Sequence, residues 1–121
     1  MKFCLSTLRV VDLEESIKFY KEIIGLPVVS RFSAGPGIEI AFLGSGETKI
    51  ELICGGESRE TDIGEDISWG FEVESLENAL SMVKEKGIAV IGEPMQPNPR
   101  TRFFFIKDPN GMRIQLIENL E

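Results

Sequence analysis

Hydrophobic and polar residues along the chain follow a pattern that occurs twice. Residues 2–10 alternate with a period of two and are rich in β-prone side chains, which predicts a strand. Asp12 and Glu15 then form a capping box, which opens a helix, and Gly25 is the residue type that ends one. The apolar face of this helix is Leu13, Ile17, Tyr20 and Ile24. Strands are expected at about 27–33, 37–43 and 48–54, with a hairpin turn at Gly44-Ser45-Gly46.

The second half of the chain repeats these signals. A strand is predicted at 67–74, and Ser75 then caps a helix that Gly87 ends. A short strand at 88–92, a loop through Pro94, Pro97 and Pro99, and a hairpin with an Asp108-Pro109-Asn110-Gly111 turn follow. The caps Asp12 and Ser75 are 63 positions apart, whereas the last strands, KIELI at 49–53 and RIQLI at 113–117, are 64 apart. The second turn is therefore expected to be one residue longer, as in a type I turn followed by a glycine bulge.

This duplication predicts an α+β fold made of two βαβββ modules, about 1–56 and about 66–121, within one domain spanning 1–121. Each module has a helix on one face of its sheet only. The two modules are expected to form a curved mixed sheet around a central cleft, and such a cleft is where a small-molecule site is expected.

Composition narrows the classes of partner. Thirteen basic and twenty acidic residues give a net charge of −7, which argues against a nucleic-acid partner. No apolar stretch is long enough to span a membrane, and the N-terminal residues carry charges where a signal peptide is apolar, so a cytoplasmic protein is expected. The two cysteines, Cys4 and Cys54, are expected to be reduced and buried, although a pair between them is a second possibility.

Strand alternation assigns side chains to the cleft. Leu5 and Ser68 occupy equivalent positions of the two repeats, as do Glu51 and Gln115. Apolar walls around a few polar groups are typical of a small-molecule site. The candidate ligand-binding residues are Leu5, Arg9, Ile40, Phe42, Glu51, Ser68, Phe103, Phe105, Arg113 and Gln115. The alternative is a filled core in which Glu51 bonds Gln115 or Arg113.

Three segments, LSTLRVVDLEESIKFYKEIIGL, KIELI and FFFIKDPNGMRIQLIE, resemble signatures of glyoxalase I and its vicinal-oxygen-chelate relatives, which include bleomycin-resistance proteins and extradiol dioxygenases. The resemblance implies homodimers of paired βαβββ modules. It also implies a metal held by one residue from each of four strands, usually His or Gln, Glu, His or Glu, and Glu. Those positions fall on Leu5, Glu51, Ser68 and Gln115.

This donor set predicts that the protein binds no metal and no other cofactor. Leucine offers no donor, and the chain contains no histidine. The position of the extradiol-type catalytic tyrosine is Phe105 here. Arg9 matches an arginine that meets the carboxylate of glutathione in relatives that use it, but Arg9 is also the repeat partner of Glu72, and a structural ion pair between them is an equal interpretation.

Three functions compete on these observations. The first is a metal-free protein that binds a small ligand, cationic or aromatic, as in the antibiotic-binding branch of the family. The second is a metal-independent isomerase or lyase in which Glu51 is the catalytic general base. The third, ranked last, is a metalloenzyme like lactoylglutathione lyase with degenerate ligands. A homodimer that contacts neither nucleic acid nor membrane is expected in each case.

Overall fold

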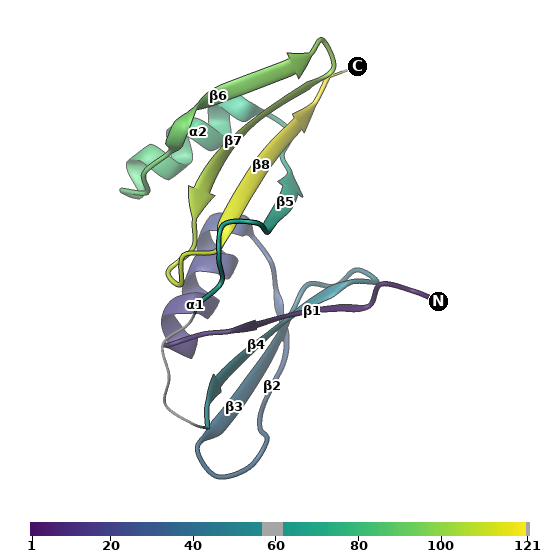
Figure 1. Cartoon of the computed structure of the whole chain (residues 1–121), viewed down its shortest axis with the longest axis vertical. Coiled ribbons are helices and arrows are strands. Elements are labelled where there is room, and N and C mark those ends of the chain that lie inside the picture. The colour runs from purple at the N-terminus through teal and green to yellow at the C-terminus, as the bar shows by residue number, and fades with distance from the viewer. Residues whose placement is uncertain (57–61, 121) are drawn as a thin grey trace. The chain divides into compact units, whose positions relative to one another are not determined.

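The structure is a computed structural model that describes residues 1–56 and 62–120. These residues form two compact units, Met1–Asp62 and Ile63–Glu121, and each unit contains one βαβββ repeat (Figure 1). The α+β fold class predicted from the sequence is confirmed. In the part of the chain that the structure describes, no helix is long and apolar enough to cross a membrane.

The first unit is a four-stranded sheet with one helical segment. Its elements are β1 (Leu5–Arg9), α1 (Leu13–Phe19), the π-helical turn η1 (Tyr20–Ile24), β2 (Val28–Ser33), β3 (Ile38–Leu43) and β4 (Lys49–Gly55). The strand order is β1-β4-β3-β2, in which β1 and β4 are parallel and the other pairs are antiparallel.

The second unit repeats this architecture. Its elements are β5 (Ser68–Glu72), α2 (Leu76–Glu85), β6 (Ile91–Asn98), β7 (Thr101–Lys107) and β8 (Arg113–Asn119). The strand order is β5-β8-β7-β6, with β5 and β8 parallel. Figure 1 shows α2 lying across one face of this sheet.

Local chemistry at the helix ends explains why the helices begin and end where the pattern predicted. The Asp12 carboxylate accepts a hydrogen bond from the amide of Glu15 at 3.2 Å, and the Ser75 hydroxyl accepts one from the amide of Asn78 at 3.2 Å. Gly25 ends the first helical segment with a φ of +87°, in the left-handed region that favours glycine.

The second hairpin turn has the predicted geometry. The amide of Gly111 donates to the carbonyl of Asp108 at 3.1 Å, and Gly111 has a φ of +91°. The Asp108 carboxylate accepts hydrogen bonds from the amides of Asn110 and Met112, both at 2.8 Å. The extra residue of the second repeat therefore lies in this turn.

Each unit packs its helix against one face of its sheet, and that interface forms the core of the unit. In the first unit the buried sheet residues are Leu8, Ala41, Leu43, Ile50 and Leu52, and in the second unit they are Phe104, Ile106, Ile114 and Leu116. These residues alternate along their strands with the candidate ligand-binding residues, as predicted.

The proline-rich segment was predicted incorrectly. The sequence predicted a strand at 88–92 followed by a loop, but β6 begins at Ile91 and continues to Asn98 through Pro94 and Pro97. Because β6 pairs only with β7, it is an edge strand, where a missing N–H is tolerated. Its pairing with β7 is irregular on both sides of Met95.

The expectation of buried cysteines was also wrong. Cys4 precedes β1 and is exposed, and Cys54 is half-buried, with its Sγ donating to the carbonyl of Val11 at 3.3 Å. Both thiols are free. They lie toward opposite ends of the β1–β4 ladder, because Cys4 adjoins the Leu5–Lys49 pair and Cys54 follows Ile53, the partner of Arg9. A disulfide between them would require closely spaced Cα atoms, so an intrachain pair is excluded by this register.

Candidate functional site

Both sheets have one face that carries no helix, which we call the helix-free face of each unit. On the first unit it consists of Leu5, Thr7, Arg9, Ser30, Phe32, Ile38, Ile40, Phe42, Lys49, Glu51 and Ile53. On the second unit it consists of Ser68, Gly70, Glu72, Thr101, Phe103, Phe105, Lys107, Arg113, Gln115, Ile117 and Asn119. All ten candidate ligand-binding residues lie on these faces, five on each. Their role in binding stays a prediction.

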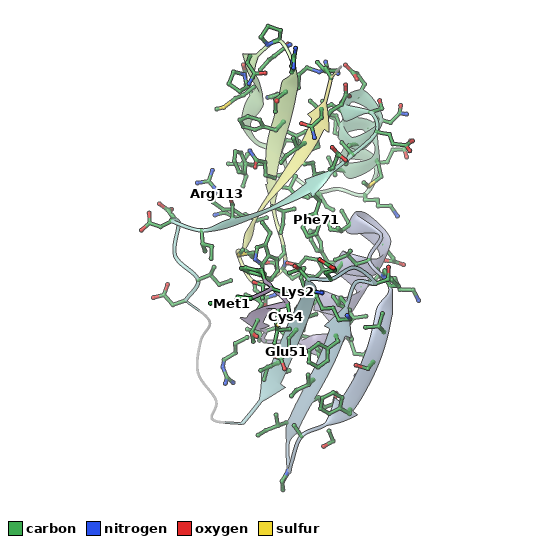
Figure 2. All side chains as sticks on the ribbon, turned by 90° about the vertical axis from the view of Figure 1, so that its right-hand side faces the viewer. Met1, Lys2, Cys4, Glu51, Phe71 and Arg113 are labelled. Carbon is green, nitrogen blue, oxygen red and sulfur yellow. The ribbon has the colours of Figure 1, made fainter. Side chains whose placement is uncertain are left out.

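Glu51, which is labelled in Figure 2, is the carboxylate among the candidate residues of the first helix-free face. It lies on β4 between Thr7 of β1 and Phe42 of β3 in the strand register. The hydroxyl of Thr7 donates a hydrogen bond to Oε1 of Glu51 at 2.7 Å. This hydrogen bond holds one of the two carboxylate oxygens in a defined orientation. The Glu51 side chain is half-buried.

Apolar side chains continue this face toward the edge of the sheet. The rings of Phe32 and Phe42 are stacked, with centroids 6.1 Å apart and an interplanar angle of 20°. Ile40 lies between Phe32 and Ile53 in the register. The first unit thus presents one carboxylate beside an aromatic and aliphatic surface.

Arg9 has a partner within its own unit. Its Nη1 donates to the backbone carbonyl of Gly55 at 3.0 Å, at the end of β4. Glu72, its repeat partner, accepts a hydrogen bond from the side-chain amide of Asn119 in the second unit. Each of these contacts ties a side chain to its own sheet.

The second helix-free face differs from the first at the equivalent positions. Gln115 lies between Gly70 and Phe105 in the register, just as Glu51 lies between Thr7 and Phe42. A Cβ atom at Gly70 would lie 3.6 Å from Oε1 of Gln115, so the glycine leaves the amide without a neighbouring side chain on β5. Arg113 lies over the ring of Phe105, with its Cζ 4.7 Å from the ring centroid.

The strand registers show how the duplicated positions correspond. Leu5 pairs with Lys49 in the first unit and Ser68 pairs with Arg113 in the second. Leu5 and Ser68 are therefore equivalent, as predicted, but each lies one register row from the Glu51 or Gln115 position.

The residues at the positions where the family resemblance implies a metal do not fit a metal ion. Leu5 has no donor atom, Ser68 offers a neutral hydroxyl, and Gln115 offers a neutral amide. Among the residues with a described placement, no three or more His, Cys, Asp or Glu side chains are grouped so that they could hold a metal ion. Divalent transition metals require several imidazole, thiolate or carboxylate ligands, which this donor set does not supply.

Thr7 and Lys107 are among the polar residues of the helix-free faces that were not candidates in the sequence analysis, and each lies opposite a candidate. The hydroxyl of Thr7 donates to Glu51, and Lys107 is the register partner of Arg113 on β8. Alternation alone placed Thr7 on the same face as Leu5 and Arg9. The signal that distinguishes it is the parallel register, which sets Thr7 opposite Glu51.

Comparisons with known proteins agree with this architecture. The sequence profile of the Glyoxalase/Bleomycin resistance protein/Dioxygenase superfamily matches residues 4–116. The chain is 30% identical over 126 residues to the lactoylglutathione lyase of Neisseria meningitidis, an alignment that covers 98% of this chain and 91% of that protein. It is also 30% identical over 124 residues to a probable lactoylglutathione lyase of Synechocystis, covering 96% of this chain and 95% of the relative.

Solved structures show the same fold. The trypanothione-dependent glyoxalase I of Leishmania major matches with a TM-score of 0.83 and 23% identity, over 98% of this chain and 86% of that one. Glyoxalase I of Zea mays matches with a TM-score of 0.85 and 24% identity, over 99% of this chain and 45% of the maize chain. Profile, sequence and fold therefore agree over nearly the whole length, and the chain belongs to the Glyoxalase/Bleomycin resistance protein/Dioxygenase superfamily.

Proposed function

We propose that this protein is a metal-free member of its family that binds a small ligand, with Glu51 anchoring a cationic group and the neighbouring aromatic side chains packing against the rest. The observation that carries the proposal is the Glu51 carboxylate, which Thr7 orients beside the Phe32–Phe42 stack. Carboxylates next to aromatic faces suit organic cations, because the ring quadrupole and the charge both attract them. A net charge of −7 favours the approach of a cation.

The donor set supports binding without a metal. The relatives named lactoylglutathione lyase are 30% identical to this chain in alignments that cover nearly its full length. Of the four positions where the family resemblance implies metal ligands, only Glu51 keeps a carboxylate here. The family's fold is thus retained while the donors needed to hold a transition metal are largely replaced.

The experiment measures, by calorimetric titration, how tightly an aromatic cation, benzyltrimethylammonium, binds to the purified chain and to Glu51→Gln. We expect saturable binding that Glu51→Gln weakens by about tenfold, since one well-placed charge contact is worth about 1.4 kcal/mol. The matched control is Glu47→Gln, which removes the same charge from an exposed side chain of the first unit that pairs with Lys2 at 3.6 Å. Equal affinities in the parent and Glu51→Gln would refute the proposal.

A second candidate is a metal-independent isomerase or lyase that uses Glu51 as a general base. The favouring observation is that Thr7 occupies Oε1, while within the described residues no hydrogen bond reaches Oε2. An oriented carboxylate with one available oxygen can accept a proton from a bound substrate. The test is whether the parent forms lactoylglutathione in the presence of a metal chelator. Formation by the parent that is abolished in Glu51→Gln would establish this function over simple binding.

We also propose that the protein is a homodimer. Strands β2 and β6 are edge strands of their sheets, and the exposed large hydrophobic residues include Val28, Val29 and Phe32 on β2. Exposed apolar surface and strand edges favour association of two copies. Sedimentation of a monomer at micromolar concentration would refute it.

A further inference from the structure

A row of hydrogen-bond donors crosses the second helix-free face at the start of β8. In the register, Arg113 lies between Ser68 on β5 and Lys107 on β7. Residues that lie directly opposite each other on neighbouring strands project to the same side of a sheet, so the three side chains share one face. A hydroxyl, a guanidinium and an ammonium thus stand side by side, and no carboxylate lies in this row.

The same row in the first unit is different. Leu5 and Lys49 occupy the positions equivalent to Ser68 and Arg113. One repeat therefore has a single cation beside an apolar side chain, whereas the other has three donors. The duplication makes this contrast informative, because the surrounding fold is the same in both units.

Arg113 is held in place without using its charge. Its guanidinium lies over Phe105 at 4.7 Å from Cζ to the ring centroid, and Phe105 in turn packs edge-on against Phe103 at 5.7 Å between centroids. Arg113 is half-buried, and its buried Nε has no hydrogen-bond partner among the residues that the structure describes. A buried donor without an acceptor costs free energy unless a further group satisfies it.

We infer that this row is a subsite for the carboxylate group of a small organic ligand, with Arg113 as the principal contact and Phe105 and Phe103 beside the ligand's apolar part. The Nε and one Nη of a guanidinium present a planar fork that matches the two oxygens of a carboxylate. Ser68 and Lys107 flank the fork with further donors. The acidic chain as a whole, at −7, disfavours highly charged anions and fits a monoanion better.

This inference deepens the proposed function and rests on it, because it adds a carboxylate-binding subsite on the second unit to the proposed role in binding a small ligand. The Glu51 and Arg113 contacts are tested separately, one on each unit, with separate probes.

The test follows the Arg113 Nε resonance by ¹⁵N NMR while sodium phenylacetate is titrated into the full chain. In the parent we expect saturable shifts of the Arg113 Nε resonance and of the Phe105 ring signals. In Arg113→Gln, which lacks this Nε, we expect no saturable shift of the Phe105 ring signals. Arg113→Lys keeps the charge but loses the fork and the ring contact, and we expect it to bind about tenfold more weakly. A thermal melt of each variant verifies that it is folded.

Two comparisons make the result decisive. Arg100→Gln removes the same charge from an exposed side chain of the second unit and should bind phenylacetate as the parent does. Inorganic phosphate at equal ionic strength should bind more weakly, and equal or tighter binding of phosphate would overturn the carboxylate assignment. An unmoved Arg113 Nε in phenylacetate would overturn the subsite, whereas failure of the Glu51 proposal would appear as unchanged benzyltrimethylammonium binding in Glu51→Gln.

Discussion

The hydroxyl of Thr7 donates a 2.7 Å hydrogen bond to Oε1 of Glu51, and the two residues are direct partners on the parallel strands β1 and β4. The bond lies on the helix-free face of the first unit, so it contributes little to the core. Its main effect is to restrict the rotamers of a carboxylate that is otherwise free to turn. Thr7 is therefore a positioning residue for the proposed anchor.

Replacing Thr7 with valine, which has nearly the same shape, tests this role. We expect Thr7→Val to weaken benzyltrimethylammonium binding by about threefold to tenfold, because the carboxylate must then be ordered at the moment of binding. The free energy of unfolding should fall by about 1 kcal/mol or less, as for one exposed hydrogen bond. Thr7→Ser retains the hydroxyl and should restore most of the affinity. Parent affinity in Thr7→Val would remove Thr7 from the site.

Replacement of Glu118 is predicted to lower the stability of the protein clearly. Its Oε1 accepts the amide of Leu76, the first residue of α2, at 2.6 Å, and also contacts Nη2 of Arg102 at 3.1 Å. Leu76 and Glu118 are both buried. Glu118→Ala leaves a buried N–H without its acceptor, and we expect a loss of about 2–3 kcal/mol in denaturant unfolding. Glu93→Ala, on the exposed part of β6, is the control, and similar small losses in both variants would contradict the assignment.

The pH dependence of stability should include a contribution from Glu77. Both carboxylate oxygens of Glu77 accept hydrogen bonds from Arg102, at 2.7 and 3.0 Å, and these bonds lower the pKa of Glu77 below its ordinary value of 4.5. A pKa that is lower in the folded state means that the contribution is complete above the unfolded pKa and is lost as the pH falls through the folded one. The melting temperature of Glu77→Gln should therefore fall less steeply than that of the parent below about pH 4.5. Parallel pH profiles would show that the pair contributes nothing measurable, as exposed ion pairs often do.

Metal content tests the interpretation of the donor set. Elemental analysis of the purified protein should find no stoichiometric Zn, Ni, Fe or Mn, since Leu5, Ser68 and Gln115 replace the usual donors. One tightly bound metal ion per chain in the parent, which is lost in Glu51→Ala, would refute the metal-free proposal.

The parts of the fold that depend on neighbouring residues in the chain could be predicted from the sequence. Asp12 and Ser75 cap helices through their own side chains, and Gly25 adopts the conformation that its residue type allows. The strand β6 could not be predicted in this way, because proline excludes a central strand but not an edge strand, and only the sheet order shows which applies. Exposure of Cys4 was missed because the predicted strand included this residue, whereas β1 begins at Leu5, three residues later than predicted.

The candidate site was predictable as a set of faces but not as a set of contacts. Alternation assigned Glu51 and Arg113 to the correct side of their sheets. The hydrogen bond from Thr7 and the stacking of Arg113 on Phe105 depend on register across strands that are distant in sequence. A pattern read along one strand carries no information on which residue lies across from it.

The extra residue in the Asp108–Gly111 hairpin has a consequence for how this chain could be altered. A one-residue change inside a strand would turn every later side chain to the other face, whereas a change absorbed by a turn leaves both faces as they were. The glycine bulge at Gly111 absorbs the difference, so Gln115 still occupies the row equivalent to that of Glu51. Lengthening or shortening of this loop should therefore be tolerated in natural or laboratory variants, and the two copies were able to differ in length without exchanging their helix-covered and helix-free faces.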